Sequence, residues 1–202
     1  MTVSSAPSAA RRGRPGYDPR QILEIAVQVF IEQGYDATSV ASLAARLGLS
    51  KSALYHHYES KEALLEVALD EAIGSLEGVL REPGAQQGPA GQRLEYVLRG
   101  AVRVLVDKLP YVTLLLRVRG NSDIERAALE RRRAFDRDVT ELVGLAQVDG
   151  TVRADIDASV ATRLLFGMVN SIVEWYRPTG VENAAALAED VLAVALDGLR
   201  TR

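Results

Sequence analysis

The sequence contains no cysteine and no long hydrophobic run. Without thiols, its 202 residues form neither disulfide bonds nor thiolate metal sites, and a reducing compartment fits this absence. No segment approaches the roughly 20 apolar residues that a membrane-spanning helix needs. Residues 1–16 lack the apolar core of a signal peptide. We therefore expect a cytoplasmic protein that has no membrane partner.

Signatures of catalysis are missing as well. The chain has no Walker-type phosphate loop, no G-x-S-x-G motif and no cluster of carboxylates with histidine. Its only two histidines are neighbours, His56 and His57. Adjacent helical side chains point about 100° apart, whereas a helical metal pair needs the spacing i, i+4. We expect no enzyme, no metal site and no cofactor.

What the sequence does contain is helical periodicity. Hydrophobic residues make up 48% of the chain and charged residues 25%, as in ordinary globular proteins. Strand patterns are almost absent. In residues 18–33 an apolar stripe recurs at helical spacing, formed by Ile22, Ile25, Ala26, Val29 and Phe30. The pattern predicts an all-α fold.

Helix boundaries follow from caps and breakers. Asp18, Thr38 or Ser39, Ser50 and Ser60 are placed as N-caps, and Gly34 and Gly48 as helix stops. The proline- and glycine-rich stretch 82–91 predicts a break, either a linker between domains or a long loop within a bundle. The expected helices cover residues 18–33, 39–47, 50–58, a segment from Ser60, 92–108, a short segment after Pro110, 122–144, 157–177 and 181–200.

Charge is distributed unevenly along the chain. Residues 1–58 hold six basic and four acidic side chains, whereas residues 59–202 hold 18 basic and 23 acidic ones. This asymmetry indicates that only the N-terminal part meets a polyanion. The alternative is a disordered tail with chance arginines.

Residues 39–58 have the length and punctuation of a helix-turn-helix, with GLS as the turn. A helix that enters the major groove needs short polar side chains and flat donors. Such side chains are Ser50, Lys51, Ser52, Tyr55, His56 and His57, whereas Leu54 and Tyr58 can face the bundle. The alternative is a solvated turn helix.

Residues 38–65, TSVASLAARLGLSKSALYHHYESKEALL, resemble the DNA-binding domain of the tetracycline-repressor (TetR) family of transcriptional regulators. The likeness extends back over the pattern A-x-x-x-F-x-x-x-G-Y-x-x-T-S, from Ala26 to Ser39. The resemblance implies a flexible basic arm at 1–16 and a helix-turn-helix domain at 17–63. It assigns effector binding and dimerisation to a helical domain at 64–202. It also implies a repressor that binds palindromic double-stranded operator DNA and is released by a small-molecule effector.

The family's DNA contacts transfer to individual positions. They fall on Thr38, Ser39, Ser50, Lys51, Ser52, Tyr55, His56, His57 and Lys61. By resemblance Thr38 and Ser39 hold a phosphate, Tyr55 lies against the DNA backbone and groove, and Lys61 binds a phosphate. Two positions depart from the family pattern: Tyr58 replaces the usual phenylalanine, and Ala53 lacks a threonine hydroxyl. The arm would reach the adjacent minor groove or its phosphates.

The last two expected helices carry wide apolar faces. A homodimer formed through these two helices as a four-helix bundle would bury them. The alternative is that both helices belong to the core of a single chain.

An effector site is harder to place. The segments RVRGNSDIERAALERRRAFD and EWYRP are similar to a branch of the family whose effectors include acyl-CoA thioesters. Arginines suit CoA phosphates, and the residues expected at this site are Tyr111, Arg117, Arg119, Phe135, Trp175 and Tyr176, with Arg131, Arg132 and Arg133 nearby. The alternative for each arginine is a salt bridge with Glu125, Glu130 or Asp136. A constitutive DNA binder and a helical adaptor remain as other functions.

Overall fold

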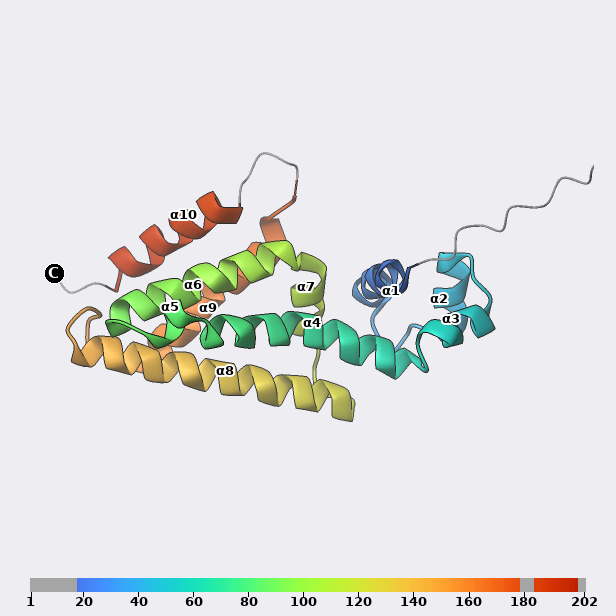
Figure 1. Ribbon diagram of the computed structural model, residues 1–202, viewed down its shortest axis with the longest axis horizontal. Coiled ribbons are helices and arrows are strands. Elements are labelled where there is room, and N and C mark those ends of the chain that lie inside the picture. Colours follow the sequence, from blue (N-terminus) through green and yellow to red (C-terminus); the bar gives the residue numbers. More distant parts are fainter. Residues whose placement is uncertain (1–17, 179–183, 200–202) are drawn as a thin grey trace, which may run out of the picture.

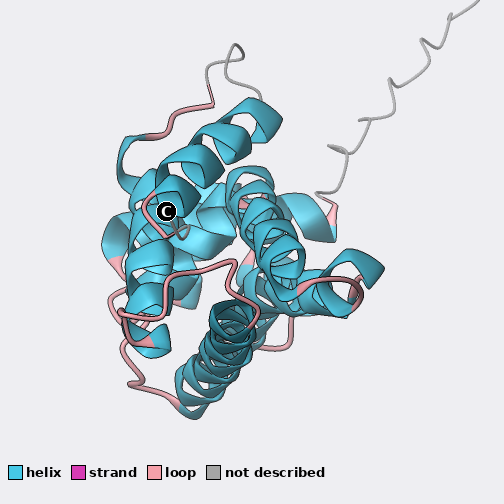
Figure 2. Ribbon diagram, turned by 90° about the vertical axis from the view of Figure 1, so that its left-hand side faces the viewer, coloured by secondary structure: helices cyan, strands magenta, loops and turns pink. Residues whose placement is uncertain are grey.

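The computed structural model describes residues 18–178 and 184–199, and every regular element in this part of the chain is a helix. The helices are α1 (Pro19–Gln33), α2 (Val40–Leu47), α3 (Lys51–His57), α4 (Lys61–Arg81), α5 (Pro83–Gln86), α6 (Ala90–Asp107), α7 (Leu109–Arg117), α8 (Asp123–Val148), α9 (Ala158–Trp175) and α10 (Ala184–Asp197). The expected all-α fold is confirmed (Figure 2).

Helices α1 to α3 form a small head at one end of the molecule, and α4 to α10 form the body (Figure 1). Helix α4 starts beside the head and runs into the body, where it packs against α6, α7 and α8. Helix α10 packs mainly on α6, and α9 on α8. Helix α4 thus joins the body to the head, and α1 of the head packs against both α4 and α7.

The helix caps explain where the helices of the head begin and end. The Asp18 carboxylate accepts from the backbone of Arg20, and the Ser39 and Ser50 hydroxyls accept from residues three positions later. Gly48 ends α2 in the left-handed region, with φ of 64°, which costs glycine little. The expected caps are confirmed, with Ser39 rather than Thr38 at the start of α2.

The stretch 82–91 does not separate two domains. Pro83 begins α5 and Pro89 precedes α6, since proline fits the first turn of a helix, where no N–H partner is needed. Helix α5 packs against both α4 and α6. A Cβ atom at Gly91 would lie 2.3 Å from the Thr151 side chain, so the chain approaches its neighbour closely here.

One continuous set of buried side chains runs through head and body. Ile22, Leu43 and Leu65 are fully buried, and so are Leu94 and Val143 in the body. Among the described residues, no helix combines the length and apolarity that crossing a membrane requires.

Candidate nucleic-acid interface and effector cleft

Helix α3 has one buried side chain, and the rest of the helix faces outward. Leu54, at 2% exposure, anchors the helix to the core. The Ser50 hydroxyl caps the helix by accepting from the backbone N–H of Ala53 at 3.1 Å. The exposed side chains on this helix are Lys51, Ser52, Tyr55, His56 and His57. The structure therefore gathers most of the expected DNA contacts on one exposed helix.

The hydroxyl of Tyr58 is used inside the protein. It donates to the carbonyl of Pro19 at 2.9 Å and thereby joins the end of α3 to the start of α1. Burial, followed by the nearby charge of Asp18, raises the pKa of Tyr58. The tyrosine at this position, in place of the family's usual phenylalanine, thus gives the head an additional hydrogen bond between α3 and α1.

Thr38 does not fit its expected role. Its side chain is 2% exposed, its hydroxyl donates to the carbonyl of Gly34 at 2.7 Å, and its backbone N–H donates to Tyr35 at 3.1 Å. A phosphate contact through this hydroxyl does not fit such burial. Ser39, the next residue, stays exposed at the start of α2.

Lys61 lies partly buried at the start of α4. Its Nζ donates to the carbonyls of Tyr35 and Thr38 at 2.9 and 3.0 Å. These contacts use two of its three N–H groups and hold the turn between α1 and α2 against α4. The phosphate contact expected from resemblance thus has one donor left. The basic arm, with Arg11, Arg12 and Arg14, lies outside the described residues.

The six residues expected around an effector do not converge. The Arg117 guanidinium donates to the carbonyl of Ile31 at the end of α1, at 2.8 Å. Phe135 and Tyr176 are buried in the body, whereas Trp175 is 53% exposed. The other two expected residues, Tyr111 and Arg119, lie near the head. Burial, followed by the charges of Glu24 and Glu71, raises the pKa of Tyr111, and Arg119 lines a cleft beside α1. The six expected residues therefore do not line one common cavity in this structure.

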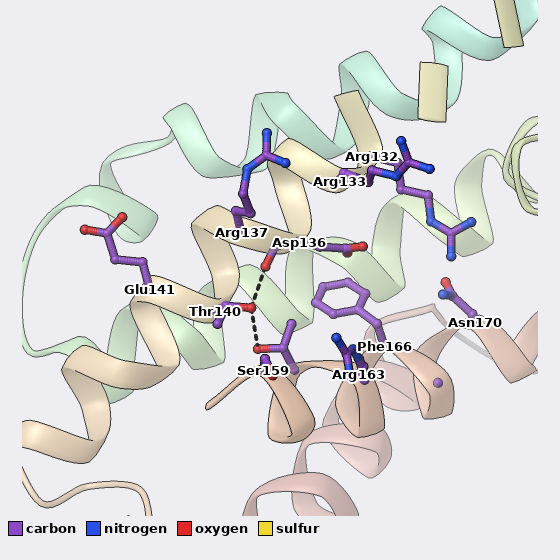
Figure 3. Close-up of a pocket in the computed structure, with 12 residues that line it drawn as sticks. Arg132, Arg133, Asp136, Arg137, Thr140, Glu141, Ser159, Arg163, Phe166 and Asn170 are labelled. Atoms are coloured by element: carbon purple, nitrogen blue, oxygen red, sulfur yellow. Dashed lines mark hydrogen bonds between the residues drawn. The ribbon is translucent and has the colours of Figure 1, made fainter. Parts of the chain in front are cut away.

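A different site lies between α8 and α9, in a cleft of about 750 Å³ (Figure 3). Helix α8 contributes Arg132, Arg133, Asp136, Arg137, Thr140 and Glu141, and α9 contributes Ser159, Thr162, Arg163, Phe166, Gly167 and Asn170. Four arginines against two acids give this candidate site, called the effector cleft after the role proposed below, a positive balance.

Two threonine hydroxyls meet across the effector cleft. The Thr140 hydroxyl donates to the carbonyl of Asp136 at 2.7 Å and lies 3.2 Å from the Thr162 hydroxyl (Figure 3). Thr162 in turn donates to the carbonyl of Ala158 at 2.9 Å. The single proton of the Thr140 hydroxyl can go either to the carbonyl of Asp136 or to the Thr162 hydroxyl, and in the second case it joins α8 to α9.

Three of the four arginines keep their donors available. Arg133 pairs with Glu130, whereas Arg132, Arg137 and Arg163 donate no hydrogen bond to another described residue. Burial raises the pKa of Asp136, and the charge of Arg132 opposes this shift. The effector cleft therefore suits an anion with several acceptor oxygens.

The effector cleft continues inward as a narrow crevice of about 30 Å³. Its lining combines Phe135, Phe166 and Val169 with side chains of α4, α6 and α7. The two phenylalanine rings meet edge to face with centroids 5.4 Å apart. This volume is about that of one water molecule, so an apolar group can enter only if these rings move.

Three residues of the effector cleft, Arg137, Arg163 and Asn170, were not among those expected from the sequence. Arg133 and Arg137 are four positions apart and share one face of α8, which was the available signal. No local sequence pattern indicates that Arg163 of α9 lies opposite that face.

Two family models match the chain. The one described as "Bacterial regulatory proteins, tetR family" matches residues 22–68. The one described as "Tetracyclin repressor-like, C-terminal domain" matches residues 87–199.

Full-length relatives agree with these matches. The transcriptional repressor KstR2 of Rhodococcus jostii is 29% identical over 192 residues, which cover 89% of each chain. A fatty acid metabolism regulator protein of Bacillus subtilis is 22% identical over 195 residues, covering 95% of this chain and all of that one.

Solved structures share the fold. SCO3833, a TetR-family member from Streptomyces coelicolor, is 48% identical with a TM-score of 0.84 and covers 100% of this chain and 96% of its own. AibR, solved with isovaleryl coenzyme A and operator DNA, is 24% identical with a TM-score of 0.72, over 88% of this chain and 97% of its own.

Proposed function

The chain belongs to the TetR family of transcriptional regulators, and we propose that it is a ligand-responsive repressor that binds a palindromic operator as a homodimer. In this proposal residues 17–63 read DNA, whereas residues 64–202 bind the effector and dimerise. The observation that carries the proposal is an exposed polar helix α3 on one end of a molecule whose body holds an arginine-lined effector cleft.

Operator reading is assigned to α3. Its exposed lysine, tyrosine and two histidines supply donors for phosphates and base edges. Since Lys51 has no hydrogen-bond partner among the described residues, its ammonium is available to a phosphate. His56 and Tyr55 are assigned to base contacts, because they lie farther along the same exposed surface.

Dimerisation is assigned to the outer faces of α9 and α10. Val160, Leu164 and Trp175 of α9 are 42%, 62% and 53% exposed, and Val194 of α10 is 68% exposed. The inner face of α10 packs on α6, where Glu189 pairs with Arg99 at 2.7 Å. A second copy would cover these outer apolar side chains in a four-helix bundle.

An acyl-CoA thioester is the effector class that suits the effector cleft. Arg132, Arg137 and Arg163 would bind its phosphates, and the acyl group would displace the rings of Phe135 and Phe166 from the crevice. The proposal of this effector class is supported by AibR, a structure of the same fold solved with isovaleryl coenzyme A and operator DNA.

Two measurements test these assignments separately. The operator is obtained by selecting duplexes from a random library, and its binding is measured by fluorescence anisotropy at increasing salt. We expect the affinity to fall steeply with salt, since bound counterions are released. His56→Ala should change preference among operator variants by about 1–3 kcal/mol, whereas Lys51→Ala should weaken binding to every duplex. Salt-independent binding would contradict DNA reading.

The effector cleft is tested by calorimetry with isovaleryl-CoA, octanoyl-CoA and palmitoyl-CoA. Arg163→Ala should weaken the binding of any thioester that binds the wild type. Arg81→Ala is the matched control, because Arg81 is an exposed arginine that pairs with Glu77 on α4 and does not line the effector cleft. Equal loss in both variants, or no binding of any thioester, would contradict the site.

A further inference from the structure

The loop between α7 and α8, residues 118–122, is shaped by one buried carboxylate. Glu125 is 3% exposed, and its Oε2 accepts from the backbone N–H groups of Arg119, Gly120 and Asn121 at 3.1, 2.8 and 2.9 Å. Gly120 has a φ of 88°, in the left-handed region. Consecutive N–H groups that converge in this way bind anions, and here the protein supplies the anion itself.

The same loop touches the head at two places. The Asn121 side chain donates to the carboxylate of Asp36 at 2.9 Å, and Arg117 donates to the carbonyl of Ile31 at 2.8 Å. Asp36 lies in the turn between α1 and α2. Since Lys61 of α4 holds this turn through its backbone carbonyls, the turn is supported from two elements of the body.

A cleft of about 680 Å³ lies between the head and this loop and is lined by the end of α1, the turn, the end of α7 and the loop. Asp36 and Asn121 both line it. Beyond the cleft, α1 packs against both α4 and α7, so the polar contacts add to packed helices in setting the position of the head on the body.

We propose that Asn121, held in place by Glu125, is a positioning residue for operator binding: its contact with Asp36 forms a second, polar support of the head in addition to the packing of α1 on α4 and α7. The packed helices limit the angle of the head, and the polar contact at the turn between α1 and α2 narrows it further. In a dimer, this angle decides which separation of half-sites the two α3 helices accept. The inference rests on the proposed dimeric operator binding.

The support also connects to the effector cleft. Helix α8 is continuous from Asp123 to Val148, so Glu125 in its first turn and Arg132 in its middle belong to one rod. A ligand that shifts α8 would therefore displace Asn121 from Asp36.

The test uses the full-length protein and a series of selected operators with one base pair removed from, or inserted between, the half-sites. One inserted pair rotates a half-site by about 35°, so the wild type should discriminate strongly against it. Asn121→Ala and Asp36→Ala should reduce this discrimination by about three- to tenfold, as expected for one lost hydrogen bond. Thermal stability and affinity for random duplexes should stay unchanged, because both side chains are exposed.

Two further variants make the result decisive. The double variant should discriminate no less than either single one, because the two residues act through one contact. Asp138→Ala is the control, since it removes an exposed carboxylate from α8 far from the loop. Wild-type discrimination that persists in Asn121→Ala and Asp36→Ala would overturn the second support. Absence of a spacing preference in the wild type would instead contradict dimeric operator binding.

Discussion

The ammonium group of Lys61 lies 4.1 Å from the centre of the Tyr35 ring while it donates to the backbone carbonyl of the same tyrosine at 2.9 Å. Burial and the neighbouring charge of Glu62 raise the pKa of Tyr35 to about 12, so the ring stays neutral at physiological pH. One lysine therefore joins the body's first helix to the turn that positions α2.

Replacement of Lys61 by alanine should affect both folding and DNA binding. We expect the free energy of unfolding to fall by about 1–2 kcal/mol, because two carbonyls lose a charged donor. The slope of operator affinity against salt should fall by about one, if the remaining donor meets a phosphate. Lys51→Ala is the control: it should lower the slope without lowering stability, since Lys51 is exposed. Urea unfolding that is unchanged by Lys61→Ala would contradict this tie.

Acid should weaken the contact between α4 and α8. Arg131 donates to both oxygens of Glu77 at 2.8 and 2.9 Å, and this hydrogen bonding lowers the pKa of Glu77 below its ordinary 4.5. The group therefore stabilises the fold above pH 4.5, and this contribution is lost as pH falls through the folded-state pKa. Glu77→Gln should be less stable at pH 7 and approach the wild type near pH 3. The free energy of unfolding of both proteins is measured in urea at each pH. A difference between them that stays the same from pH 7 to pH 3 would contradict the prediction.

Replacement of each of two helical glycines by alanine should change the stability of the protein in opposite directions. A Cβ atom at Gly100 of α6 would lie 2.4 Å from a methyl group of Val79, whereas one at Gly144 of α8 meets nothing within 4 Å. Gly100→Ala should destabilise the protein by about 1–3 kcal/mol through overpacking. Gly144→Ala should stabilise it by up to about 1 kcal/mol, since alanine favours helices. Urea unfolding measures both, and equal effects would show that α4 and α6 are not this close.

The burial of Asp136 should oppose folding at neutral pH. Burial raises its pKa, so its charged form is less favourable in the folded chain than in the unfolded one. Asp136→Asn should therefore be more stable than the wild type at pH 7, and the difference should shrink as pH falls and the carboxyl group protonates. A less stable variant at pH 7 would indicate that Arg132 holds the carboxylate more tightly than burial penalises it.

The head could be predicted from sequence because its signals are local. Asp18, Ser39 and Ser50 cap helices within three residues of themselves, and Gly48 ends a helix at its own position. Thr38 shows the limit: its neighbour Ser39 carries the cap, and only packing revealed that Thr38 is buried.

The effector cleft could not be predicted from the sequence, because the packing between helices determines which side chains line it. Arg131, Arg132 and Arg133 are consecutive and point about 100° apart on α8. The first pairs with Glu77 of α4, the second lines the effector cleft with no ion pair to another described residue, and the third lines the cleft but pairs with Glu130 on its own helix. Sequence shows three equivalent arginines, whereas the fold gives them three roles.

The central claim is that an anion in the effector cleft controls DNA binding by α3. The direct measurement is the operator dissociation constant at increasing palmitoyl-CoA, by fluorescence anisotropy, for the wild type and Arg163→Ala. We expect the thioester to weaken operator binding by the wild type about 5- to 150-fold, which corresponds to a coupling of about 1–3 kcal/mol, and to leave the variant nearly unaffected. A thioester that binds the wild type but leaves its operator affinity unchanged, or weakens both proteins equally, would contradict the claim.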